Sequence, residues 1–222
     1  MVKRDKAFYR APMKIVAISD THERHKLITL PDGDVLVHAG DITKNGSIDA
    51  IREFAAFMQQ APHTHKIVIA GNHDFCFENE LTGEAEEILR QSGVIYLRDS
   101  GVTIDGVKFW GSPWQPWFFD WAFNLQRGSE LAEKWALIPE DTNVLITHGP
   151  PYEVSDCTIE GLHVGCEELS KRIEQLHHLK LHIFGHIHEG YGIVKLGGVT
   201  YANASICDVR YRPVNAPLTL FA

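Results

Sequence analysis

The segment Lys14-Ile15-Val16-Ala17-Ile18-Ser19-Asp20-Thr21-His22 joins a short apolar run to a carboxylate and an imidazole. The run Lys14–Ile18 is aliphatic and nearly continuous, which is typical of a strand covered on both faces. Further runs of the same character are predicted as strands: Val35–Ala39, Lys66–Ala70, Val144–Thr147 and His182–Phe184. Because each run ends in polar residues, the sequence predicts a sheet whose strands deliver polar side chains to one edge.

Helical patterns alternate with these strands at Ser47–Gln60, Gly83–Gln91, Ser129–Leu137 and Gly165–Leu176. In the first pattern apolar residues recur at helical spacing, and Ser47 is expected to cap its start. Two hairpins are predicted, one at Asp105-Gly106 and one at Gly197-Gly198. The mixture of β-α units and hairpins predicts a layered α/β fold with mixed sheets. No repeat or linker interrupts the 222 residues, so a single domain, 1–222, is expected.

The composition limits the classes of function. The formal charge is -8, and an acidic chain is not expected to bind a nucleic-acid polymer or an anionic membrane, because such partners recruit clustered Lys and Arg. No apolar stretch has the length of a membrane helix, and no secretory core follows the basic Met1–Lys6. The 4 cysteines form no CxxC pair, which favours a reduced, cytoplasmic setting.

Each predicted strand is followed by side chains that bind metals or transfer protons. Open α/β sheets place their sites at the carboxyl ends of strands, so these side chains are expected to converge. The candidate metal ligands are Asp20, His22, Asp41, Asn72, His148, His186 and His188. Glycines at 40, 71, 149 and 185 are expected to allow sharp exits and close backbone approach.

The candidate ligands carry carboxylate, amide and imidazole groups and no thiolate, which favours Mn, Fe, Zn or Mg. They are too many for one ion, so two divalent ions sharing a bridging group are expected, roughly 3.5–4 Å apart. The charge of two such ions exceeds that of Asp20 and Asp41, and the positive remainder suits an anionic phosphoester.

The blocks Asp20-x-His22, Gly40-Asp41, Gly71-Asn72-His73-Asp74, His148 and Gly185-His186-x-His188 resemble, in this order, the calcineurin-like metallophosphoesterase superfamily. Further stretches resemble its branch of metallophosphoesterase-domain-containing proteins: Gly111–Trp117, His148–Pro151, His188–Gly192 and Asn203–Ser205. The resemblance implies a four-layer αββα sandwich with two mixed sheets and metals at the sheet ends.

The resemblance also implies roles for these side chains. The first ion would be held by Asp20, His22, Asp41 and His188, and the second by Asp41, Asn72, His148 and His186, with Asp41 bridging. His73 would be the catalytic histidine that is not a ligand, protonating the leaving oxygen or steadying the phosphoryl charge. The implied activity is hydrolysis of phosphoesters by in-line attack of a metal-bridging hydroxide. Phosphodiesters of the nucleotide or 2′,3′-cyclic nucleotide type are favoured, with Mn²⁺ ahead of Fe, Zn and Mg.

Two alternative functions stay open: a phosphomonoesterase of the same fold, and a non-catalytic scaffold that binds a protein partner. Both retain the predicted fold, and only the first is an enzyme. The expected partner is otherwise a small-molecule phosphoester, and the oligomeric state is left open.

Several residues have two interpretations. The tryptophans at 110, 114, 117 and 121 are either a packed aromatic loop or a pocket wall in which Trp114 and Trp117 contact substrate. Arg24 either binds phosphate or forms a surface salt bridge. Asp74 either orients His73 or caps a turn. The histidines that match no block are expected to be structural or exposed: His25, His38, His63, His65, His163, His177, His178 and His182.

Overall fold

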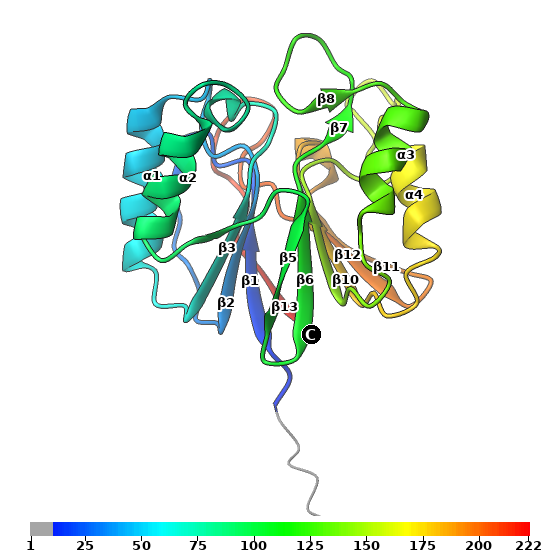
Figure 1. The fold of residues 1–222 in the computed structure, drawn as a ribbon, viewed down its shortest axis with the longest axis horizontal. Coiled ribbons are helices and arrows are strands. Elements are labelled where there is room, and N and C mark those ends of the chain that lie inside the picture. The colour runs from blue at the N-terminus through cyan, green and yellow to red at the C-terminus, as the bar shows by residue number, and fades with distance from the viewer. Residues whose placement is uncertain (1–10) are drawn as a thin grey trace, which may run out of the picture.

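The computed structural model describes residues 11–222, and Met1–Lys6 lies outside them. Two sheets lie face to face, and helices cover the outer side of each (Figure 1). The helices are α1 (Ile48–Gln60), α2 (Thr82–Gln91), α3 (Ser129–Ala136) and α4 (Glu167–Ile173). The order of layers is therefore helices, sheet, sheet, helices, which confirms the predicted αββα sandwich.

The first sheet is five-stranded with the order β13-β1-β2-β3-β4. Its strands are β1 (Lys14–Ile18), β2 (Val35–Ala39), β3 (His65–Ile69), β4 (Ile95–Tyr96) and β13 (Leu218–Phe221). The second sheet is six-stranded with the order β11-β12-β10-β9-β6-β5. Its strands are β5 (Ser100–Ile104), β6 (Val107–Ser112), β9 (Val144–Thr147), β10 (Leu181–Phe184), β11 (Gly192–Leu196) and β12 (Val199–Asn203). Edge strands β13, β11 and β5 are antiparallel to their neighbours and the inner strands are parallel, so both sheets are mixed as predicted.

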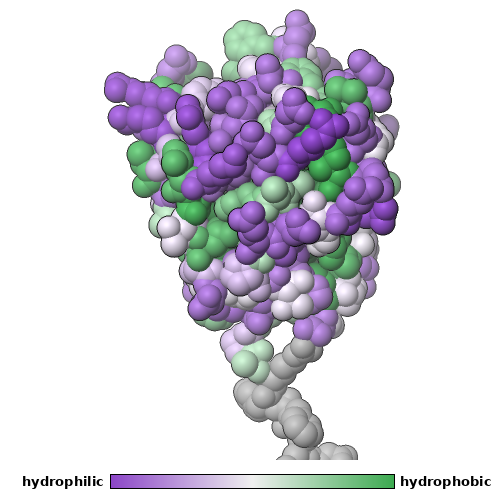
Figure 2. All heavy atoms as spheres, turned by 90° about the vertical axis from the view of Figure 1, so that its left-hand side faces the viewer, coloured by the Kyte–Doolittle hydropathy of each residue, from purple (hydrophilic) through white to green (hydrophobic). Residues whose placement is uncertain are grey.

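Burial on both faces explains why the strands are continuously apolar. Along β1, Ile15 and Ala17 pack between the two sheets, whereas Val16 and Ile18 pack beneath the helices. The helices cover this second core with one apolar face, as Phe54 of α1 illustrates. Figure 2 shows the side of the molecule that carries α1 and α2, where hydrophilic side chains predominate between smaller hydrophobic areas.

Several local predictions differ from the structure, among them those for β3 and β10, which each begin one residue earlier than predicted. The last helix spans Glu167–Ile173 rather than Gly165–Leu176, because the backbone N–H groups of Gly165 and Cys166 donate to Asp156 and Pro150 and Cys166 is extended. Ser47 occupies the N-cap position of α1 but makes no capping hydrogen bond, and Asp49 instead places a negative charge in the first turn. The short strands β4 and β13, and the pair β7 (Gln115–Pro116) and β8 (Asn124–Leu125), carry no alternation long enough to be predicted.

The two sheets are joined at the edge where the parallel strands end. Ser19, just beyond β1, forms a parallel bridge with Ser205, just beyond β12. The backbone N–H of Ser19 donates to the carbonyl of Ala204 at 2.8 Å. This junction brings the loops that follow β1, β2, β3, β9 and β10 to a common edge. Within residues 11–222, no helix is both long and apolar enough to cross a bilayer.

Candidate metal centre

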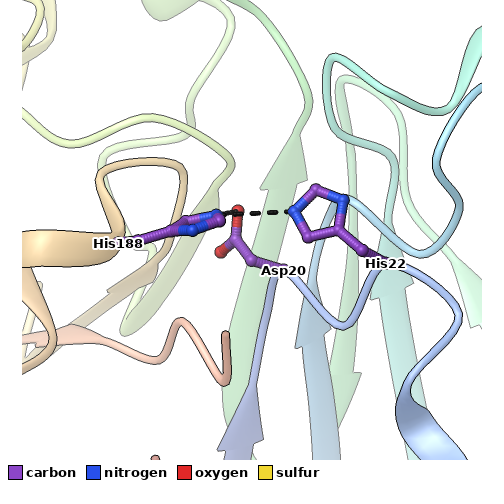
Figure 3. Close-up of side chains that lie close together, drawn as sticks. All are labelled: Asp20, His22 and His188. Atoms are coloured by element: carbon purple, nitrogen blue, oxygen red, sulfur yellow. Dashed lines mark hydrogen bonds and ion pairs between the residues drawn. The ribbon is translucent and has the colours of Figure 1, made fainter. Parts of the chain in front are cut away.

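Side chains from the five loops meet at this edge and form overlapping groups of potential ligand atoms. The groups are Asp20, His22 and His188; His22, Asp41 and His73; and Asp41, His148 and His186, each with ligand atoms within 4.8 Å of one another. Figure 3 shows the first group, in which His188 and His22 approach the carboxylate of Asp20 from two sides. Asn72 joins through its Oδ1, which lies 2.9 Å from Nε2 of His148. The structure thus brings all seven candidate ligands together, with His73 beside them.

Asp20 is fully buried, and its carboxylate accepts hydrogen bonds from groups other than imidazole rings. The backbone N–H of His186 donates to both carboxylate oxygens at 3.0 Å, and the hydroxyl of Ser205 donates to Oδ2 at 2.9 Å. Burial opposes the charged form, but the hydrogen bond and charge of His188 outweigh it and hold the pKa of Asp20 well below its usual range. The carboxylate is therefore ionised and fixed in orientation.

Asp41 is a member of both of the other groups, and it is 2% exposed. Its Oδ1 accepts the backbone N–H of His73 at 2.9 Å and lies 3.4 Å from Nε2 of His148. Burial again opposes ionisation, yet the charge of His148 keeps the pKa of Asp41 well below normal. In return, Asp41 raises the pKa of buried His148 to about 9. Two ionised carboxylates in a buried space create a demand for positive charge.

Four histidines share one anchoring pattern that fixes which ring nitrogen faces the carboxylates: His22, His73, His148 and His188. Nδ1 of His148 lies 3.0 Å from the carbonyl of Ala39, and Nδ1 of His188 lies 2.9 Å from the carbonyl of Asp208. A carbonyl oxygen only accepts, so each Nδ1 carries a hydrogen and Nε2 faces the cluster, where it can carry a proton or bind a cation in its place. The same arrangement pairs Nδ1 of His22 with Thr43 and of His73 with Lys44. Metal-binding histidines are oriented in this way by their second nitrogen.

The backbone of the cluster is bent into conformations that side chains rarely adopt. The φ angles are 51° at Asp20, 40° at His22, 58° at Asp41 and 68° at His186. Such left-handed residues each cost of the order of 1–3 kcal/mol and gather at functional sites. The strained turns bring successive polar side chains of one loop to the same space.

Glycines allow the loops to approach closely at three of the four predicted positions. A Cβ at Gly40 would lie 2.6 Å from Nδ1 of His148. One at Gly71 would collide with Asp41, and one at Gly185 with Asp20. Gly149 has its nearest neighbour at 3.6 Å, so the prediction for that position is wrong.

Asp74 links two of the ligand loops rather than orienting the ring of His73. Its carboxylate is buried and accepts hydrogen bonds from the backbone N–H groups of Ile42, Thr43 and Gly71, at 3.1, 2.8 and 2.9 Å. The Thr43 hydroxyl also donates to it, at 2.9 Å. Asp74 therefore ties the loop after β2 to the loop after β3.

A cavity of about 230 Å³ opens over the cluster. It is lined by Asp41, Asn72, His73, Phe118, Trp121, His186, His188, Glu189, Val209 and Tyr211. The aromatic wall expected from the tryptophan loop is present, but Trp121 and Phe118 form it. The ring of Trp121 lies 4.2 Å from that of His73.

The three predicted substrate contacts lie outside this lining. Trp114 is 8% exposed, and its indole N–H donates to Asp99 at 2.8 Å, so it belongs to the packed core. Trp117 is 54% exposed and Arg24 is exposed, and neither lines the cavity. The cavity lining therefore does not support these three contacts, and the spacing of residues in a proline-containing loop does not reveal which side chains face the ligand cluster.

Tyr211 is a lining residue to which nothing in the sequence pattern points. Its ring centre lies 4.7 Å from that of His22 and 5.8 Å from that of His188. The only nearby signal is the Asn203-Ala204-Ser205 stretch, which precedes its loop.

The donor set fits divalent cations. Buried carboxylate and amide oxygens lie beside imidazole Nε2 atoms, and a divalent cation can replace the protons that these atoms otherwise share. Asp41 faces both sides of the cluster, with Oδ2 3.7 Å from Nε2 of His22 and Oδ1 3.4 Å from Nε2 of His148.

Comparisons with known proteins relate this chain to one family by sequence and by fold. Residues 13–190 match the calcineurin-like phosphoesterase family. The human protein named metallophosphoesterase domain-containing protein 1 is 44% identical over 93% of this chain and 70% of its own length. UPF0046 protein K07C11.7 of Caenorhabditis elegans is 42% identical over 91% of this chain and 74% of its own length. The crystal structure of TT1561 of Thermus thermophilus shares the fold, with a TM-score of 0.61 and 17% identity over 95% of this chain and 99% of its own.

Proposed function

The chain belongs to the calcineurin-like phosphoesterase family, and from this premise we propose that it is a binuclear metal-dependent phosphodiesterase. The observation that carries the proposal is the position of Asp41 beneath one open cavity. Its Oδ2 lies 3.7 Å from Nε2 of His22, a proposed ligand of the first ion, and its Oδ1 lies 3.4 Å from Nε2 of His148, a proposed ligand of the second. A single carboxylate that serves two groups is the feature expected of a bridging ligand. The ligand set is the one given above, with Mn²⁺ favoured.

Bound ions would bind the phosphoryl oxygens and lower the pKa of an attacking water. The protein residues hold the two carboxylates and the imidazole nitrogens in place before substrate arrives. The hydrogen bonds to Asp20 and the carbonyl anchors of the histidines supply this order, so little reorganisation is needed during reaction.

We assign proton delivery to His73. Its side chain is 12% exposed, and Nδ1 lies 2.7 Å from the carbonyl oxygen of Lys44. Nε2 is thus directed to the cavity, 3.9 Å from Oδ2 of Asp41. A positioned histidine of this kind can hold a proton for the leaving oxygen or stabilise the phosphoryl charge.

The charges around the cavity favour diesters over monoesters. Within the described residues 11–222, the lining of the cavity contains no lysine and no arginine, and it includes the carboxylate of Glu189. A diester carries one negative charge, whereas a monoester carries up to two near neutral pH. A site whose only strong positive charge comes from bound ions therefore favours the diester. Nucleotide and 2′,3′-cyclic nucleotide diesters belong to this class, and the proposed partner is a small molecule.

All 4 cysteines are free thiols, which supports a reduced, cytoplasmic setting.

The test of function is hydrolysis of bis(p-nitrophenyl) phosphate, with p-nitrophenyl phosphate as the monoester, assayed with Mn, Fe, Zn and Mg and with a chelator. Turnover that requires metal and favours the diester is expected. Preference for the monoester would make the protein a phosphomonoesterase, and no metal-stimulated turnover of any phosphoester would favour the scaffold.

A further inference from the structure

An apolar rim stands beside the metal ligands without a role in the chemistry described so far. Phe118 and Trp121 come from the loop between β7 and β8, and Val209 and Tyr211 from the loop after β12. All four line the same cavity as His73 and Asp41. Phe118, Val209 and Tyr211 are 50%, 48% and 43% exposed, respectively, so each has apolar surface left to cover.

The loop that carries Tyr211 is braced from within. The carboxylate of Asp208 accepts the backbone N–H groups of Arg210 and Arg212, at 2.9 and 3.0 Å, and the guanidinium of Arg212 through Nε at 2.8 Å. Cys207 and Pro213 pair across its base. The brace holds Tyr211 at φ 57°, a conformation that an aromatic residue seldom adopts. The cost of this strain makes sense if the position of the ring matters.

The same loop is fastened to the metal ligands. The carbonyl of Asp208 accepts the N–H of Tyr211 at 2.8 Å and also accepts Nδ1–H of His188 at 2.9 Å. The ring of Tyr211 stands edge-on to His22, with an interplanar angle of 85°. One backbone carbonyl therefore sets both the orientation of a candidate ligand and the position of the tyrosine over the cluster.

The side chains of the rim indicate which kind of ligand group they can contact. Aromatic and aliphatic side chains favour an apolar, flat partner, which aromatic rings contact edge-on or offset. Within the described chain, the cavity lining contains no lysine or arginine to neutralise a second anionic group, and the carboxylate of Glu189 would repel one. The organic part of the ligand is thus expected to be uncharged.

We propose that Tyr211 is a substrate-positioning residue that, together with Phe118, takes an uncharged aromatic substituent of the phosphodiester. This inference rests on the phosphodiesterase function proposed above. It adds the identity of the substituent and the residue that selects it.

The experiment compares two symmetric monoanions, diphenyl phosphate and dimethyl phosphate, as ligands of the metal-loaded protein by calorimetry. Because both substituents are the same in each compound, the orientation of the phosphodiester does not affect the comparison. The wild-type protein is expected to prefer diphenyl phosphate by about tenfold or more, given the apolar area of a phenyl group. Tyr211→Ala is expected to reduce this preference by about fivefold, the size of one aromatic contact, whereas Tyr211→Phe retains it.

Two further variants complete the test. Phe118→Ala, on the other loop, is expected to lower the preference as well, so the inference does not depend on one variant folding. Tyr152→Ala is the matched control, since Tyr152 is a partly exposed tyrosine outside the cavity lining. Equal affinity of the wild type for the two compounds, failure of both to bind, or an unchanged preference in Tyr211→Ala overturns the inference. Binding can be measured without turnover, so the two proposals can fail separately. If the protein prefers diphenyl phosphate through Tyr211 but hydrolyses no phosphoester, the proposed activity is refuted and the proposed subsite is not.

Discussion

Ser205→Ala is expected to weaken the binding of one of the two metal ions. Ser205 and Asp20 are both 0% exposed, and the hydroxyl of Ser205 lies 2.9 Å from Oδ2 of Asp20 and 2.8 Å from Oδ1 of Asn203. A hydroxyl donates one hydrogen, and an ionised carboxylate is the stronger acceptor. The Ser205 side chain is therefore expected to hold the carboxylate in its ligating orientation.

The magnitude follows from the type of hydrogen bond that is removed. A hydrogen bond to a charged group contributes about 1.5–3 kcal/mol, and loss of a partner that orients a metal ligand costs about 10–100-fold in metal affinity. Asp20 is assigned to the first ion only, so the affinity of the second ion is expected to change much less. Calorimetric titration of the metal-free protein with Mn²⁺ should resolve a strong and a weakened site.

Ser112→Ala is the matched control for this prediction. Ser112 is 1% exposed, and its hydroxyl also donates to a carboxylate, Oδ1 of Asp99, at 2.7 Å, but Asp99 lies outside the ligand groups. Both variants lose a buried hydrogen bond of the same kind, and only Ser205→Ala should lose metal affinity. If the two variants bind Mn²⁺ as tightly as each other, the hydroxyl of Ser205 serves Asn203 and the reasoning is refuted.

Three further predictions concern histidines. His73→Ala should keep both ions by elemental analysis but lose about 10²–10⁴-fold in turnover of bis(p-nitrophenyl) phosphate, and undiminished turnover would remove its assigned role. His186→Ala should deplete one ion, so a full metal complement would contradict its assignment as a ligand. His25 is buried against Phe54 and Phe57 with neither ring nitrogen hydrogen-bonded, and burial lowers its pKa from 6.5 to about 4. Folding favours the neutral form of His25. Its contribution to the free energy of unfolding is therefore fully present above about pH 6.5 and is lost as the pH falls toward 4, by about 2 kcal/mol between pH 7 and 5. His25→Leu should abolish that part of the acid sensitivity in denaturant unfolding with chelator present, and an unchanged pH dependence would show that His25 is not its source.

The apolar runs predicted the fold well because burial on both faces leaves a clear pattern. The bounds of β1, β2 and β9 agree with the prediction at every residue, and the glycine turn predicts the β11–β12 hairpin. Helix ends were harder to place, since the residues before α4 are held by hydrogen bonds to Pro150 and Asp156, which they approach only in the folded chain. Periodicity cannot report such contacts.

The candidate site divides in the same way. Side chains that directly follow strands were recognised from the sequence, because strand ends have a fixed place in the fold. The roles of Ser205, Asp74 and Tyr211 could not be assigned in this way, although Ser205 and Asp74 also follow strands, β12 and β3. Ser205 reaches Asp20 across 185 positions of the chain, and Tyr211 reaches His22 through a loop shaped by Asp208 and Arg212. Their roles depend on tertiary contacts between loops that carry no pattern of their own.

The departures from local backbone preference are themselves informative about the site. Asp20, Asp41 and His186 adopt positive φ angles just beyond strands that are buried on both faces. Strain and buried like charge at one edge are tolerated only because the two cores beneath it are extensive, and they are retained only where they serve a purpose. An acidic chain with a formal charge of -8 can therefore still bind an anionic substrate. The divalent ions proposed for the cluster would supply the positive charge that the cavity lining lacks, and they would relieve the repulsion between Asp20 and Asp41.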